Sequence, residues 1–175
     1  PLVLATPDFA AGTRDRAPDW RFAPLPASSE EGASVSRRLG VRLHEGAAAS
    51  RELLLGARNA EIIHLSTHSF LIPSAQETTE GIGGDGRPPL FRMRAALDDS
   101  LDRSGIALAG ADRDLELPSA APRGLVFASE LMDLDLLGTD LVVLSSCESG
   151  LGDAVPGDGV QGFRRAFRAA GAASV

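Results

Sequence analysis

A cysteine and a histidine in this chain have the residue types and the surroundings of a nucleophile and its base. Cys147 is the single cysteine among 175 residues, and it follows the apolar run Leu141–Leu144. His68 comes directly after a second mostly apolar run, residues 60–67. A thiol beside an imidazole ionises more readily and attacks carbonyl carbons. If the fold brings the two side chains together, the pair predicts acyl-transfer chemistry.

The other interpretation of Cys147 is that it is a small buried hydrophobe, as most free cysteines are. Position alone leaves this open. The run 141–144 is short, wholly apolar and half β-branched, which predicts a central strand buried on both faces of a parallel sheet. Loops at the carboxyl ends of such strands hold ligands and catalytic groups. The glycine-rich stretch after Cys147 lets the backbone there turn sharply.

Strands and helices alternate along the chain, which predicts a parallel, doubly wound α/β sheet. The predicted strands are 2–5, 41–44, 60–67 and 141–144, and the predicted helices are about 28–39, 48–58 and 158–170. The carboxyl ends of parallel strands share one edge of the sheet. His68 and Cys147 therefore emerge side by side if their strands are neighbours.

Capping residues mark the ends of two of these helices. Ser28 with Glu31, and Asp158 with Gln161, have the spacing of a capping box. Gly40 is placed to end the first helix. The apolar residues Val160, Phe163 and Phe167 fall on one face of the last helix, and Gly171 is placed to end it.

The stretch 69–103 is irregular and reads as a loop or insertion near the active edge. Residues 81–86 match Gly-x-Gly-x-x-Gly, but no strand precedes them and two prolines follow, so we interpret them as loop rather than as a nucleotide fingerprint. The apolar segments 104–112 and 124–127 can pair as a small hairpin near the site, followed by a helical turn capped by Ser129.

Composition excludes several classes of function. The formal net charge is −7 and all basic residues except histidine are arginine, so there is no P-loop or Schiff-base lysine. Three arginines near residue 166 are read as a solvated helix face, not a nucleic-acid surface. No run reaches membrane-spanning length and no signal peptide opens the chain. We expect a soluble, cytoplasmic protein with no nucleic-acid or membrane partner.

Further polar residues near the two candidates have alternative roles. His64 and His68 form a His-x-x-x-His pair, but the segment is strand-like and lacks a third ligand, so His64 is read as structural and no metal or cofactor is expected. Glu148 either lines a specificity pocket or is a solvated loop carboxylate. Asp153 and Asp158 are read as structural.

Several blocks of this sequence resemble the CHAT domain family, which comprises caspase-like proteins related to separases and usually attached to tetratricopeptide repeats. The blocks are Ile62–Phe70, Ser104–Asp112, Leu141–Gly152 and Ala169–Val175. The Cys-Glu-Ser-Gly segment also resembles the nucleophile segment of legumains, in the same peptidase clan, clan CD. The resemblance implies a single caspase-like domain over residues 1–175, with three α/β/α layers. We expect a fragment of a longer chain, with a sheet that is incomplete at its C-terminal end.

The resemblance also implies the roles of individual residues. Cys147 would be the nucleophile and His68 the general base of a cysteine endopeptidase that acts on a protein or peptide substrate. The backbone N–H groups of Cys147 and Ser69 would form the oxyanion hole. The family usually has glycine directly after the catalytic histidine, so Ser69 would be strained if that position needs a positive φ. A tetratricopeptide or sensor region outside this chain would regulate activity.

Two other functions remain open at the level of sequence. A non-catalytic interaction module could retain the same fold, and it would bind its partner without Cys147. A Rossmann-like nucleotide binder would retain a dinucleotide, although no glycine fingerprint supports it.

Overall fold

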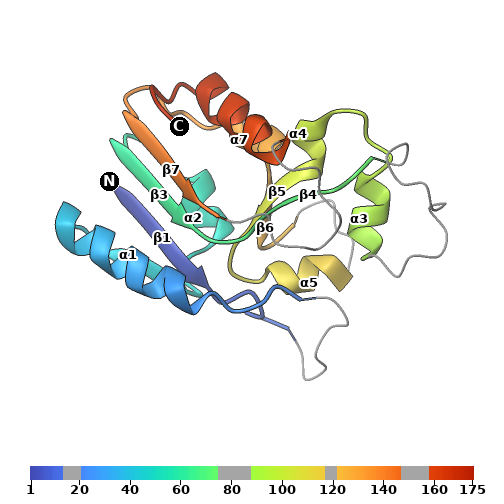
Figure 1. Cartoon of the computed structure of the whole chain (residues 1–175), viewed down its shortest axis with the longest axis horizontal. Coiled ribbons are helices and arrows are strands. Elements are labelled where there is room, and N and C mark those ends of the chain that lie inside the picture. The colour runs from blue at the N-terminus through green and yellow to red at the C-terminus, as the bar shows by residue number, and fades with distance from the viewer. Residues whose placement is uncertain (14–20, 75–87, 117–121, 147–157) are drawn as a thin grey trace.

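Four parallel strands form the larger sheet, in the order β2-β1-β3-β7 (Figure 1). The computed structural model describes residues 1–13, 21–74, 88–116, 122–146 and 158–175. The strands are β1 (Leu2–Pro7), β2 (Leu43–Gly46), β3 (Ile62–Ser66) and β7 (Leu141–Ser145). β3 and β7 pair directly, from Ile62 opposite Leu141 to Ser66 opposite Ser145. The strands that lead to His68 and Cys147 are therefore neighbours, and the predicted parallel α/β sheet is confirmed.

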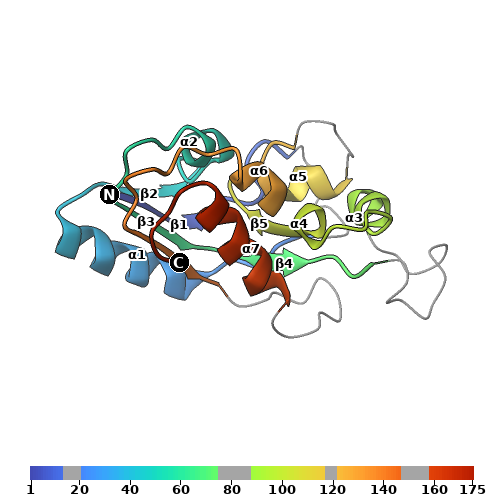
Figure 2. The ribbon, with the colours of Figure 1, turned by 90° about the horizontal axis from the view of Figure 1, so that it is seen from above.

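Helices cover both faces of this sheet, which gives three layers (Figure 2). α1 (Pro26–Leu39) packs on one face, where an added Cβ at Gly32 would lie 2.5 Å from the Cβ of Ala5. This close approach requires glycine at that point of the helix. α2 (Arg51–Leu55) lies on the other side of the sheet.

The main hydrophobic core lies on the face opposite α1. Leu4 and Ile63 of the sheet share it with Leu54 of α2 and with Phe163 and Phe167 of the last helix, α7 (Asp158–Ala169). Each of these side chains is at most 2% exposed. Burial of Phe163 and Phe167 on one face of α7 confirms the predicted apolar stripe at these two positions.

A second, antiparallel sheet extends from the carboxyl edge of the first. It consists of β4 (Ser69–Leu71), β5 (Ser104–Ala107) and β6 (Leu125–Phe127), in that order. The pairing of β5 with β6 confirms the predicted hairpin, and β4 adds a third strand. Between β3 and β4, the Thr67 hydroxyl donates to Ala107 O at 2.5 Å and Ala107 N donates to His68 O at 3.0 Å. These bonds fix His68 where the two sheets meet.

Short helices complete the described part of the chain. They are α3 (Pro89–Arg94), α4 (Ser100–Arg103), α5 (Ala111–Glu116) and α6 (Ala128–Leu131). The stretch 69–103 thus contains β4, α3 and α4, while the glycine motif at 81–86 lies outside the described residues. No helix among those residues has the length and apolarity to cross a membrane.

The start of α1 differs from the capping-box prediction. The helix begins at Pro26, whose fixed φ suits the first turn, and its N-cap Leu25 makes no side-chain cap. Ser28 donates instead to Ser66 O at 3.0 Å, and Glu31 also bonds to the strands. The predicted end of the helix is correct, because Gly40 takes the left-handed conformation with φ of 66°.

Two further predictions, the Ser129 cap of α6 and the burial of β7 on both faces, are wrong. The N-cap of α6 is Phe127, not Ser129, and its N–H is accepted by the Glu130 carboxylate at 2.9 Å. β7 is not buried on both faces, since Leu141 is 37% exposed and its last residues are half-buried. Among the described elements β7 pairs with one strand, β3, and beside its other edge the backbone of residues 173–174 bonds to Thr139 and Val142.

Candidate active site

His68 is held in a defined orientation immediately after β3. The residue is 8% exposed, and its ring packs against Phe9 and Phe22, with ring centroids 5.3 and 5.6 Å away. Its Nε2 lies 2.7 Å from the carbonyl oxygen of Ala23. A carbonyl only accepts hydrogen bonds, so Nε2 carries the proton and Nδ1 of the neutral ring keeps its lone pair.

The segment that supplies this carbonyl is itself anchored. Phe22 N donates to Asp112 Oδ1 at 2.8 Å, across 90 residues of sequence. Asp112 lies on α5 and is 3% exposed. α5 therefore fixes residues 22–23, which in turn orient His68. Neither Ala23 nor Asp112 has a sequence signature for this role, because the contact depends on the tertiary fold.

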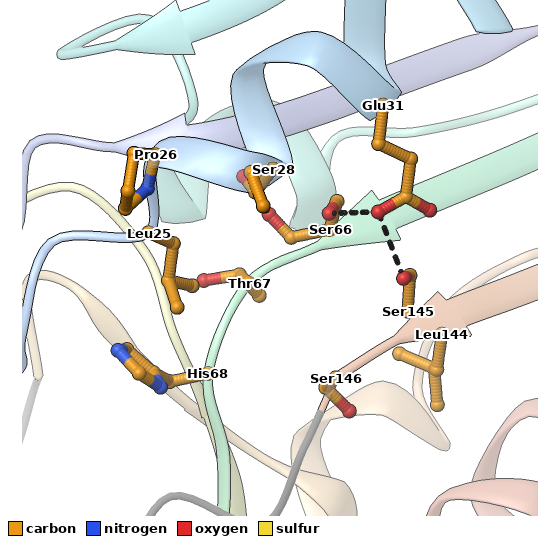
Figure 3. A pocket seen from close by; sticks show the side chains of 11 residues that line it. Leu25, Pro26, Ser28, Glu31, Ser66, Thr67, His68, Leu144, Ser145 and Ser146 are labelled. Atoms are coloured by element: carbon orange, nitrogen blue, oxygen red, sulfur yellow. Dashed lines mark hydrogen bonds between the residues drawn. The ribbon is translucent and has the colours of Figure 1, made fainter.

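A pocket of about 590 Å³ opens between the start of α1 and the carboxyl ends of β3 and β7 (Figure 3). The described residues that line it come from these three elements and the segments beside them: Leu25, Pro26, Ala27, Ser28, Glu31, Ser66, Thr67, His68, Leu144, Ser145 and Ser146. Ser146 directly precedes Cys147 in the sequence. The fold therefore brings His68 and the residue next to the predicted nucleophile to one pocket.

Some predicted site residues lie outside the described part of the chain. These are Cys147, Glu148 and Asp153, together with the side chains of Asp158 and Val160. Their predicted roles therefore remain predictions.

Ser69, the predicted oxyanion-hole residue, lies in β4 and is 5% exposed. The non-glycine residues with positive φ in the described segments are Thr6 and Asn59. Serine at position 69 therefore carries none of the left-handed strain that a missing glycine would cause.

The carboxylate of Glu31 lies at the pocket, although the sequence predicts that it caps a helix. Glu31 Oε2 accepts hydrogen bonds from the hydroxyls of Ser66 and Ser145, at 2.8 and 2.9 Å (Figure 3). Its Oε1 lies 3.1 Å from Nε2 of His64, which is 6% exposed. The two serines occupy paired positions of β3 and β7. Two serines at paired positions of neighbouring strands indicate that one polar group can bond to both, and this is the signal that the sequence offers once the strands are aligned.

His64 and His68 face different surroundings, Glu31 in one case and the two phenylalanine rings in the other. In the described segments, no three His, Cys, Asp or Glu side chains come together as a group that could hold a metal ion.

The parallel sheet between two helical layers, with a histidine at its carboxyl edge, is consistent with a caspase-like α/β fold. The family model of the CHAT domain matches residues 1–175, and the chain belongs to this family. It is 33% identical over 179 residues to tetratricopeptide repeat protein 28 of Mus musculus, and 30% identical over 183 residues to tetratricopeptide repeat protein 28 of Homo sapiens. Each match covers 99% of this chain but 7% of the relative. No solved structure matches the chain.

Proposed function

We propose that this domain is a cysteine endopeptidase in which Cys147 is the nucleophile and His68 the general base. One observation carries the proposal. His68, oriented through its Nε2 by Ala23 O, lines the same pocket as Ser146, the residue before Cys147. The Nδ1 lone pair is then the basic site available to a thiol.

The proposed reaction has two halves. His68 takes the thiol proton, and the thiolate of Cys147 attacks the peptide carbonyl carbon to form a tetrahedral intermediate. The imidazolium returns the proton to the leaving amine as the C–N bond breaks, which leaves a thioester. Water, activated by the neutral imidazole, then hydrolyses the thioester and restores the thiol. The hydrogen bond to Ala23 O keeps the ring in place and stabilises its charged form.

The backbone N–H groups of Ser69 and Cys147 are the proposed oxyanion hole. The position of Ser69 in a regular strand supports this, because serine there needs no strained backbone. Serine in place of the usual glycine is therefore compatible with the proposed oxyanion hole.

Regulation by a region outside the chain is part of the same proposal. The two relatives are named for tetratricopeptide repeats, and this chain spans about 7% of their length. A repeat region has room in such proteins to sense a partner and to control access to the pocket.

Hydrolysis of fluorogenic peptide reporters by the purified protein tests the proposal. We expect activity that falls at least about 1000-fold in Cys147→Ala and in His68→Ala, because each change removes one partner of a unit that acts together. His44→Ala, on β2 and outside the pocket residues, is the matched control and should retain activity. Equal hydrolysis by all variants would contradict the proposal. No hydrolysis, with partner binding that survives Cys147→Ala, would favour the interaction module instead.

A further inference from the structure

The pocket carries its negative charge at the end away from His68. Among the described lining residues, Glu31 is the single carboxylate and none is an arginine. Figure 3 shows Glu31 and His68 at opposite ends of the labelled side chains. A substrate side chain that enters beside His68 and extends along the pocket therefore approaches a carboxylate.

This carboxylate is oriented before any substrate arrives. The hydroxyls of Ser66 and Ser145 both donate to Oε2, which fixes the plane of the group from two strands. Oε1 faces His64 at 3.1 Å. A carboxylate has about four acceptor positions, so these contacts leave capacity for another donor. An orientation fixed in advance lowers the entropy cost of binding.

A purely structural role, bracing α1 against β3 and β7, explains these contacts less completely. The Glu31 side chain is 36% exposed, whereas its partners Ser66 and His64 are buried. His64 Nε2 is buried and makes no hydrogen bond to a described residue, in spite of its distance from Oε1. A closed bracing network would satisfy both groups. Of these groups, Glu31 lines the pocket and is partly exposed, so its carboxylate keeps polar capacity that faces the pocket.

The rest of the pocket suits a long side chain with a charged end. Leu25, Pro26 and Leu144 provide apolar wall, against which the methylene stem of arginine or lysine can pack. The geometry points to Glu31 as the residue that selects arginine or lysine directly before the scissile bond. This inference rests on the proposed function, because it takes His68 as the position of the scissile bond.

The first test compares two reporters with side chains of nearly the same shape, one with arginine and one with the uncharged citrulline before the scissile bond. We expect the wild-type protein to prefer arginine by about 100-fold in kcat/KM, because citrulline leaves the carboxylate without its cation. In Glu31→Gln the ratio of arginine to citrulline hydrolysis should fall to within about threefold. Glu30→Gln, at the exposed neighbouring position of α1, should keep the full preference. Denaturant unfolding of each variant controls for folding.

The second test needs no turnover. Calorimetric binding of the arginine and citrulline peptides to Cys147→Ala, with and without Glu31→Gln, separates the inference from the proposed function. Glu31-dependent binding of arginine without wild-type hydrolysis would support Glu31 as the selecting group and refute catalysis. Hydrolysis with no preference for arginine, or with the same preference in Glu31→Gln, would overturn the inference and leave the peptidase standing. Failure of both binding and preference would overturn it as well.

Discussion

His68 shows how one backbone carbonyl can set the chemistry of a side chain. Ala23 O accepts from Nε2 at 2.7 Å, and the Phe9 and Phe22 rings restrict rotation of the imidazole. Asp112 holds the segment through Phe22 N at 2.8 Å. In the proposed reaction Asp112 is therefore a positioning residue, which acts on the thiol only through Ala23 and His68.

Asp112→Ala tests this chain of contacts. The change leaves the Phe22 N–H without its acceptor, which costs about 1–3 kcal/mol in the free energy of unfolding. It also releases Ala23, so we expect kcat to fall by about tenfold or more, with a smaller change in KM. Steady-state kinetics and denaturant unfolding measure the two effects. Asp133→Ala, at an exposed position, should change neither. Loss of stability with unchanged kcat would reduce Asp112 to a structural role.

At the scale of elements, apolar runs predicted the strands better than capping motifs predicted the starts of the helices. The apolar runs correctly indicated β1, β3 and β7, since burial in a parallel sheet favours continuous apolar sequence. The strand predicted at 41–44 lies two residues further on, as β2, and is not apolar. The cap at Ser28 and Glu31 was wrong because these side chains bond to strand residues far away in the sequence, and tertiary partners outweigh a local motif. The adjacency of β3 and β7 brings His68 and Ser146 to one pocket, whereas the contacts of Ala23 and Glu31 arise only through packing.

Arg51 joins α2 to the antiparallel sheet. Its guanidinium makes two bonds to the Glu130 carboxylate, at 2.6 and 3.1 Å, and a third to Leu125 O at 3.0 Å. Arg51→Lys keeps the charge but loses the paired geometry, so we expect the free energy of unfolding to fall by about 1–2 kcal/mol.

Denaturant unfolding checks this value, with Arg58→Lys as the control. The Arg58 side chain is 71% exposed and its contact with Asp135 is 4.0 Å, so its change should stay within about 0.5 kcal/mol. Equal effects at the two positions would show that the paired geometry at Arg51 has no special contribution.

At the scale of the whole molecule, one core joins the two sheets. Ile63 and Val142 of the parallel sheet share a hydrophobic cluster with Ile106 and Val126 of the antiparallel one. The pocket thus lies where rigid elements meet, and His68 is attached to both sheets through the residues around it.

The central claim, that His68 activates Cys147, is tested most directly by the pH dependence of iodoacetamide alkylation. Cys147 is the single cysteine, so alkylation of the chain reports on that thiol alone. In the wild-type protein we expect alkylation near pH 6 at least about tenfold faster than that of an ordinary thiol. In His68→Ala the rate should rise only near the ordinary thiol pKa of about 8.5. Identical profiles for the two proteins, both matching a free thiol, would contradict the account.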